Sequence, residues 1–235
     1  MKSLKHYYKY LFAIILSFLL SSSFAQNAIE NDTFKYWQPN TKVTQQDFKA
    51  VSTSDFTHMN QKYCLNVYSY FGIHSILDVP KKKKERGQKL EKIYIAPYMN
   101  KYLSVSKSTD SSDIAKEQVL FDITELFARK ARKKLKTILD DSKHAYGIYW
   151  SIYSSIISDM CMSKNKVSLL YLKEVIYLKT EGAYEKWRKD LDQLLDELKE
   201  FATTPEDCRR FMKDKPLSED YIMSPNYAGE IKCDN

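Results

Sequence analysis

The sequence predicts an α+β fold in which a small antiparallel sheet is followed by a helical half. Apolar and polar residues alternate in several short segments between residues 63 and 105, which is typical of strands. From residue 114 to residue 198, apolar residues instead recur every three or four positions, which is typical of amphipathic helices. The chain has only 5 glycines but 18 tyrosines, and this fits a helix-rich body better than a turn-rich β-sandwich.

The strands are expected in the first half of the chain. Residues 63–71 alternate, and residues 72–79 either continue this strand after a kink or form a second one. Further strands are expected at 93–98 and 102–105. The lysine-rich segment 80–87 could touch an anionic surface, but we expect a solvated hairpin loop, since Glu85 interrupts the run and Gly87 ends it.

The longest helix is expected from Ile114 to Ile138, because no Gly or Pro interrupts this stretch. Ser111, Ser112 and Asp113 precede it and are suitable N-terminal caps. Its apolar positions share one face, and we expect Leu120 on that face to point into the core. The positions are Leu120, Ile123, Phe127, Ala131, Leu135 and Ile138. Glu125 and Arg129, four residues apart, suit an ion pair on the helix surface.

Three shorter helices should follow. The first is expected at 144–162, and the second is expected to be capped by Ser163 or Asn165 and to carry the apolar stripe at 169–176. The segment Thr180-Glu181-Gly182 should end this pattern. The last helix is expected over residues 187–198.

Residues 1–25 have the pattern of a secretory signal peptide. Lysines precede an apolar core of about ten residues, and Ser23-Phe24-Ala25 offers small residues at the cleavage positions. This core is shorter than the ~20 residues that a membrane-spanning helix needs. We therefore expect an exported protein, periplasmic or secreted, with a mature chain that starts at Gln26 and has no stable membrane span.

The expected mature chain has 34 basic and 30 acidic residues, because the signal segment contains three of the 37 Lys and Arg residues and no acid. This mild excess does not indicate nucleic-acid binding. We expect one α+β domain over 26–201 and a polar C-terminal tail over 202–235.

Four cysteines fit an oxidising compartment. Cys208 and Cys233 bracket the tail, and we predict a disulfide between them because the tail has little core of its own. Cys64 and Cys161 could pair across the core or remain buried thiols.

The helix at 114–138 also carries a resemblance. Its segment Glu117-Gln118, then Phe121 to Arg129 and Arg132, resembles the signature helix of the domain of unknown function 922 family, described as predicted secreted zinc-dependent proteases. That helix begins His-Glu-Gln-x-His-Phe-Asp. The resemblance implies a zincin-like long helix, with two histidines and a third residue as zinc ligands and the glutamate as the base that activates water.

Here the two histidine positions are Lys116 and Leu120, and neither side chain can replace a neutral imidazole as a zinc ligand. Glu181 stands near the position of a third family ligand. Glu117 remains, but we expect it to be a carboxylate on the surface of the first helical turn. No catalytic residue and no cofactor is expected, and zinc is expected only if this interpretation is wrong.

The leading hypothesis is therefore a catalytically inactive relative of these proteases that binds an envelope protein or peptide. One alternative is a hydrolase whose metal is held by other residues. Another is a purely structural periplasmic adaptor.

Overall fold

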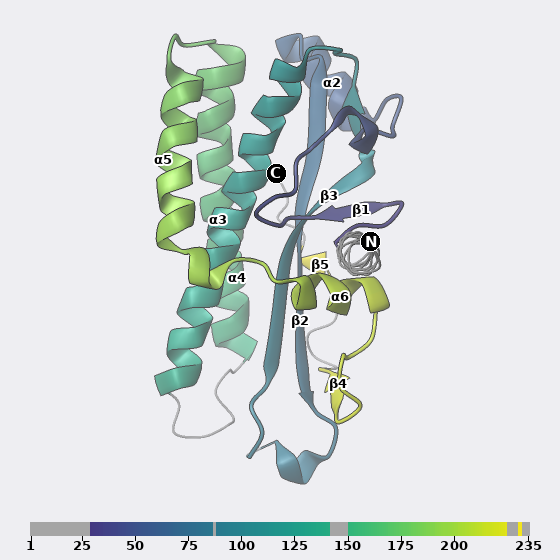
Figure 1. Ribbon diagram of the computed structural model, residues 1–235, viewed down its shortest axis with the longest axis vertical. Helices are drawn as coiled ribbons and strands as arrows, with labels where there is room; N and C mark the ends of the chain where they lie inside the picture. Colours follow the sequence, from purple (N-terminus) through teal and green to yellow (C-terminus); the bar gives the residue numbers. More distant parts are fainter. Residues whose placement is uncertain (1–28, 87, 142–149, 225–229, 232–235) are drawn as a thin grey trace, which may run out of the picture.

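The computed structural model describes residues 29–86, 88–141, 150–224 and 230–231, and confirms the α+β class. The predicted signal segment lies outside the described residues. Figure 1 shows a long, twisted β-hairpin with a helical layer on one face. In the part of the chain that is described, no helix combines the length and the apolar character needed to cross a membrane.

The hairpin forms the centre of the sheet. Strand β2 (Val67–Pro80) pairs antiparallel with β3 (Lys92–Ser106), and the sheet order is β1-β3-β2-β4. β1 (Phe34–Tyr36) pairs with β3, while β4 (Tyr221–Met223) and β5 (Glu230–Ile231) both pair with β2. The lysine-rich segment is the exposed hairpin loop and contains a short 3-10 turn, Lys83–Glu85.

The strands were only partly predicted. Residues 67–80 form one strand, and so do residues 92–106, where two separate strands were expected. The expected strand start at Tyr63 is wrong, because α2 (Ser54–Tyr63) precedes it. The side chain of Thr53 accepts a hydrogen bond from the Phe56 N–H and caps this helix.

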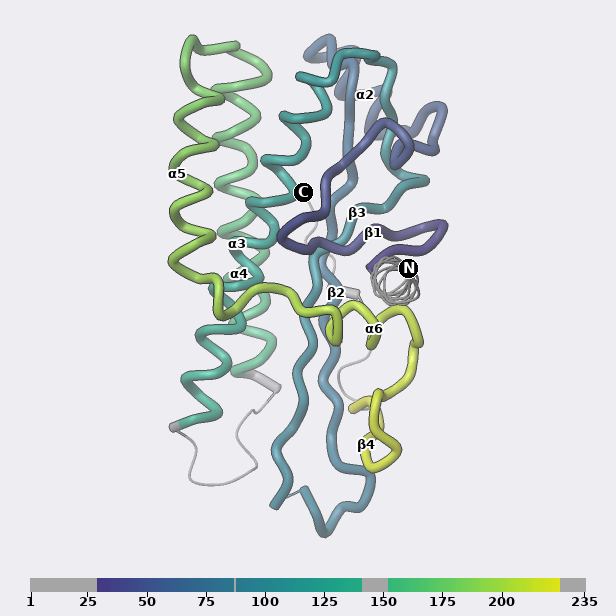
Figure 2. Tube along the Cα trace, in the orientation of Figure 1, coloured from purple at the N-terminus to yellow at the C-terminus, as the bar shows by residue number. Residues whose placement is uncertain are grey.

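Helix α3 (Ser111–Asp141) is continuous over the predicted range and packs along the sheet. Beside it run α4 (Trp150–Tyr171) and α5 (Ala183–Glu197) (Figure 2). The predicted helix start at Ser163 or Asn165 is wrong, since α4 continues to Tyr171 and then becomes a π-helix, Leu172–Tyr177. The predicted break at 180–182 is confirmed, and Gly182 adopts a positive φ of 70° just before α5.

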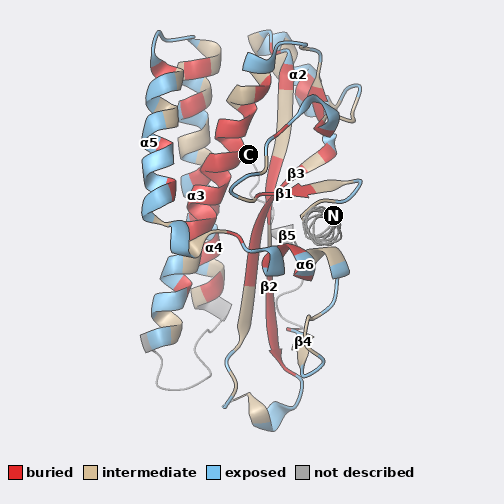
Figure 3. Cartoon of the chain, viewed as in Figure 1, coloured by how far each residue is buried: buried red, intermediate tan, exposed pale blue. Residues whose placement is uncertain are grey.

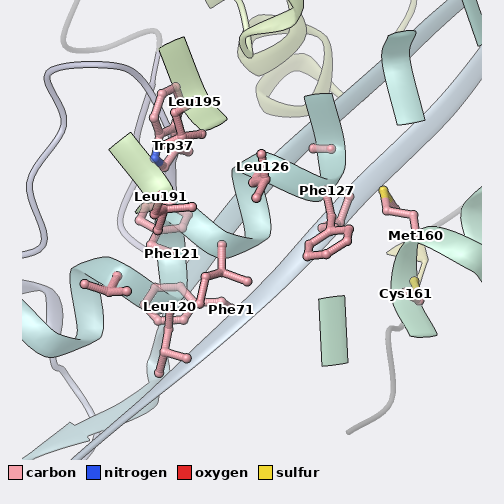
Figure 4. Packing of buried hydrophobic residues seen from close by; sticks show 14 of the residues in the cluster. Trp37, Phe71, Leu120, Phe121, Leu126, Phe127, Met160, Cys161, Leu191 and Leu195 are labelled. Carbon is pink, nitrogen blue, oxygen red and sulfur yellow. The ribbon is translucent and has the colours of Figure 1, made fainter. Parts of the chain in front are cut away.

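The two faces of the hairpin have separate cores, as the period of two along a strand requires. Phe71 and Ile73 face the helices, and Leu120 packs in the same cluster as predicted (Figure 4). Gly72 and His74 face the opposite way. A Cβ at Gly72 would lie 2.4 Å from the ring of Tyr98, its partner on β3, so this position has room only for glycine.

The segment after residue 202 is anchored firmly to this second face. It contains α6 (Pro205–Lys213), which packs beside the sheet (Figure 1). Within it the fully buried Arg210 donates two hydrogen bonds to the equally buried Asp78 of β2, at 2.7 and 2.8 Å. A bidentate charged pair of this kind fixes the position of α6 on the sheet.

The predicted Cys208–Cys233 disulfide is wrong. Cys208 is a buried thiol outside any disulfide, and Cys64 is an exposed one, whereas Cys161 is disulfide-bonded. Cys233 lies outside the described residues. The prediction rested on a loosely attached tail, but α6 is held by the Arg210–Asp78 pair and needs no covalent link next to it.

Candidate binding cleft

Helix α3 is buried on all sides in its middle, where residues 117–129 are buried without a break (Figure 3). The sheet covers one side of it, and α4 and α5 cover the others. Polar residues in this stretch therefore pair with one another. Arg129 donates to Glu125 at 2.8 Å as predicted, but the pair is buried rather than on the surface.

The four residues of the predicted vestigial site do not all meet. Lys116 is half-buried, and its ammonium lies 3.0 Å from Asp113. Leu120 is buried and lines a cleft between the sheet and α4. Glu181 is exposed in the turn before α5 and does not line that cleft.

Glu117 is the residue for which the sequence prediction was wrong. It was expected on the helix surface, but it is only 5% exposed and lines the same cleft as Leu120. Burial raises the pKa of its carboxyl to about 7, because water no longer stabilises the charged form. Ser69 on β2 lies beside the carboxyl and partly opposes this rise, although its hydroxyl makes no hydrogen bond of ordinary geometry.

The cleft has a volume of about 590 Å³, within the range typical of small-ligand sites. It lies between the start of β2, the middle of α3 and the last turns of α4 with the π-helix. Its walls are largely apolar. The apolar and aromatic lining residues are Met59, Leu65, Val67, Tyr68, Tyr70, Phe71, Leu120, Leu169, Leu172, Ile176 and Tyr177.

The π-helix shapes one wall of the cleft. Single π-turns are rare and occur frequently at functional sites. Leu172 and Ile176 contribute side chains from it, and Tyr177 at its end stacks on Tyr63 of α2 with ring centroids 3.9 Å apart. This stack joins the end of the helical layer to α2.

Lys164 is a site residue that the sequence analysis missed. It lies on α4, lines the cleft and is only 5% exposed. Burial lowers the pKa of its ammonium to about 8. The missed signal was its spacing: Met160, Lys164 and Ser168 are four residues apart and continue one face of the helix, past the point where a helix end was predicted.

A second cavity, of about 770 Å³, lies on the other side of α3. Three of its charged residues are paired with one another, because Arg188 forms ion pairs with both Asp122 and Asp192. Asp122 accepts hydrogen bonds from Trp37 at 2.7 Å, Gln118 at 2.9 Å and Arg188 at 2.6 Å. Such a saturated carboxylate holds the N-terminal segment and α5 against α3 and has little capacity left for a ligand.

Among the described residues, no three His, Cys, Asp or Glu side chains are grouped so that they could hold a metal ion. The Glu117 carboxyl lies at the wall of a largely apolar cavity, and its raised pKa of about 7 means that its charge changes near neutral pH. Comparison with models of known families, with curated proteins and with solved structures finds no match to this chain.

Proposed function

We propose that this chain is an exported, non-catalytic binding protein that holds its ligand in the cleft beside Glu117. The resemblance of α3 to the signature helix of the predicted zinc proteases supports a shared ancestry of the scaffold. Lys116 and Leu120 replace the imidazoles, so that Glu117 has no metal-bound water to act on. The position of a catalytic base then becomes the polar anchor of a binding site.

One observation carries this proposal: a carboxyl is kept buried at the wall of a largely apolar cavity. Burying an ionisable group destabilises a fold unless the group pairs with a partner. The described protein groups near Glu117 do not cancel this cost, because the net effect on its pKa is a rise. A bound ligand that donates hydrogen bonds to the carboxylate would offset the part of this cost that Ser69 leaves.

Metal content tests the non-catalytic part. Protein purified without a His tag should contain no stoichiometric zinc and should not cleave denatured casein. Lys116→His combined with Leu120→His should gain zinc, because residues four apart share one helix face. Circular dichroism must show that this double variant folds, since Leu120 is a core residue. One tight zinc in wild type that survives both substitutions would overturn the proposal in favour of the hydrolase alternative.

Occupancy of the cleft tests the binding part. Anilinonaphthalene sulfonate, an apolar fluorescent probe, should bind the wild-type protein with enhanced fluorescence. Leu172→Trp places a larger ring in the cleft wall and should weaken the probe at least about tenfold, which is 1.4 kcal/mol. Leu178→Trp is the matched control, because Leu178 is 63% exposed and does not line the cleft. Equal binding by both variants would show that the cleft is not the site.

A further inference from the structure

The loop that joins β2 to β3 forms one end of the molecule. The last residue pair of this hairpin is Asp78 with Lys92, so the residues between them lie beyond the paired part of the two strands. Figure 1 shows this loop at the lower end of the longest axis, below the last described turns of α3. Pro80 follows Phe71 of the candidate cleft by nine residues of extended strand, which places the loop about 30 Å from the cleft.

This end of the molecule has an excess of positive charge. Residues 80–92 contain seven Lys and Arg residues but only two Glu residues. The segment 218–223, which contains the neighbouring strand β4, adds Glu219 and Asp220. Seven basic residues therefore stand against four acidic ones, and the loop keeps a net charge of about +3 at neutral pH.

The acidic residues pair with some of the loop lysines and leave others without an ion pair. The Glu85 carboxylate lies 3.5 Å from the Lys82 ammonium and 3.0 Å from the Lys89 ammonium. Asp220 lies 3.4 Å from Lys89 on the other side. Three exposed lysines of the loop have no carboxylate within ion-pair distance among the described residues, and these are Lys81, Lys83 and Lys84.

Backbone hydrogen bonds hold the loop in a defined turn. The N–H groups of Gln88 and Lys89 both donate to the Glu85 carbonyl oxygen at 2.9 Å. At the start of the loop, the Lys81 N–H donates to the Asp220 carbonyl oxygen at 2.7 Å, which ties the loop to the segment before β4. Because the backbone is already ordered, the loop loses little conformational entropy when it binds a surface.

An exposed leucine lies next to these lysines. Leu90 is 54% exposed, and its carbonyl oxygen accepts a hydrogen bond from the Tyr221 hydroxyl at 2.9 Å. The Lys92 ammonium lies 4.6 Å from the centre of the Tyr221 ring. A single exposed leucine is ordinary on a protein surface. Lysines combined with a leucine and a tyrosine are typical of segments that rest on a membrane surface, where cations contact headgroups and apolar groups enter the layer below.

We propose that this loop docks the protein on a surface of anionic phospholipid. Lys81, Lys83 and Lys84 contact the phosphate headgroups, and Leu90 enters the boundary between the headgroups and the acyl chains. Binding of this kind is reversible and needs no membrane-spanning helix. The proposal does not depend on the ligand of the cleft, which lies at the other end of the hairpin.

A nucleic acid offers the same phosphate charges but fits the loop less well. Its backbone would attract the lysines and would be sensitive to salt in the same way. It has no apolar layer that Leu90 could enter, so the exposed leucine would contribute little to binding. The dependence on Leu90 therefore distinguishes the two partners.

Sedimentation with lipid vesicles tests the proposal on the full chain. The wild-type protein should bind vesicles of phosphatidylglycerol mixed with phosphatidylcholine but not vesicles of phosphatidylcholine alone. Raising the salt to about 1 M should release it, because the Debye length falls to about 3 Å. These two measurements use the wild-type protein, so they hold even if a variant fails to fold.

Two sets of substitutions locate the contact. One lysine near an anionic surface strengthens binding about fivefold, so Lys81→Gln, Lys83→Gln and Lys84→Gln combined should weaken vesicle binding about a hundredfold. Leu90→Ser should weaken it about tenfold, because less apolar area enters the lipid. Circular dichroism of each variant checks that it is folded.

Matched variants control for the change in charge and in apolar area. Lys166→Gln, Lys173→Gln and Lys189→Gln combined remove the same charge from exposed positions of the helical layer and should leave vesicle binding within about twofold of wild type. Leu178→Ser is the control for Leu90→Ser, because Leu178 is 63% exposed and lies far from the loop in the sequence. It should bind vesicles as wild type does.

Three results would overturn the proposal. The first is equal binding to neutral and anionic vesicles, because charge would then not be the attraction. The second is an equal loss of binding in the loop and control lysine variants, because the loop would then not be the contact. The third is binding of a DNA duplex that the loop lysines support and Leu90→Ser leaves unchanged, without binding to vesicles, which would replace the membrane by a nucleic acid.

Discussion

Replacing Glu117 by Gln should change how the stability of the protein depends on pH. The pKa of this carboxyl is raised from an ordinary 4.5 to about 7 in the folded state. Between these two values the folded chain holds a proton that the unfolded chain has lost. The folded state therefore binds more protons, and its free energy of unfolding falls as the pH rises through this window.

The size of the effect follows from the shift. One pKa unit corresponds to 1.36 kcal/mol, so the shift of Glu117 removes about 3 kcal/mol of stability between pH 4.5 and pH 7. Glu117→Gln keeps the shape of the side chain but cannot ionise. We expect the variant to gain about 3 kcal/mol relative to wild type when the pH is changed from about 4.5 to 8.

The assay is urea unfolding of both proteins at pH 4.5, 6 and 8, monitored by far-UV circular dichroism. His74 titrates in the opposite direction, because burial lowers its pKa to about 4 and its contribution to stability is lost as the pH falls from 6.5. This contribution is common to both proteins and cancels in their difference. Exposed Glu181→Gln is the control. If the stability difference between wild type and Glu117→Gln stays constant within about 0.5 kcal/mol, the carboxyl is not buried as described.

Three further changes test the packing. Arg210→Met should destabilise the protein by about 3–5 kcal/mol in urea unfolding, because it leaves Asp78 charged and buried, whereas adding Asp78→Leu should restore most of the loss. A double variant as unstable as the single one would contradict this. Gly72→Val should lower the melting temperature by several degrees, because its Cβ would meet a tyrosine ring; an unchanged melting temperature would show that the ring moves freely. In the folded protein a maleimide should modify Cys64 but spare Cys208, whose pKa burial raises to about 12, and mass spectrometry of the labelled peptides would detect the opposite order.

The sequence predicted the features that depend on local periodicity. The run from Ile114 to Ile138 lies in one helix, with Leu120 in the core, because its apolar spacing and the absence of Gly and Pro leave no competing local structure. The break at Gly182 was equally clear. The alternation along residues 63–71 indicated a strand, but its predicted start at Tyr63 was too early. The helix that Thr53 caps extends to Tyr63, so the strand begins only at Val67.

The candidate site was only partly predictable in this way. The spacing places Glu117 on the same helix face as the apolar stripe, three residues before Leu120, but its charge and its place near the helix start favoured the surface. The first helix after α3 was predicted to end at residue 162, before Lys164. The cleft that encloses Lys164 is lined by the start of β2, which lies about one hundred residues earlier in the sequence. For both residues the local spacing indicated the helix face, but the depth of burial comes from contacts between distant segments, which a local pattern does not show.

The link between β2 and the end of the described chain has a consequence for folding order. Asp78 of β2 can pair with Arg210 only after 132 further residues have been synthesised. β4 and β5, which pair with β2, follow later still. Closing such long loops is slow, because chain entropy is lost before the contact forms. During synthesis the hairpin and the helical layer emerge first. Until β4 and β5 follow, the edge of β2 that does not pair with β3 has no strand partner. β4 and β5, which are synthesised after the helical layer, therefore complete this edge of the sheet, and a chain that lacks them would present an unpaired strand edge to other chains.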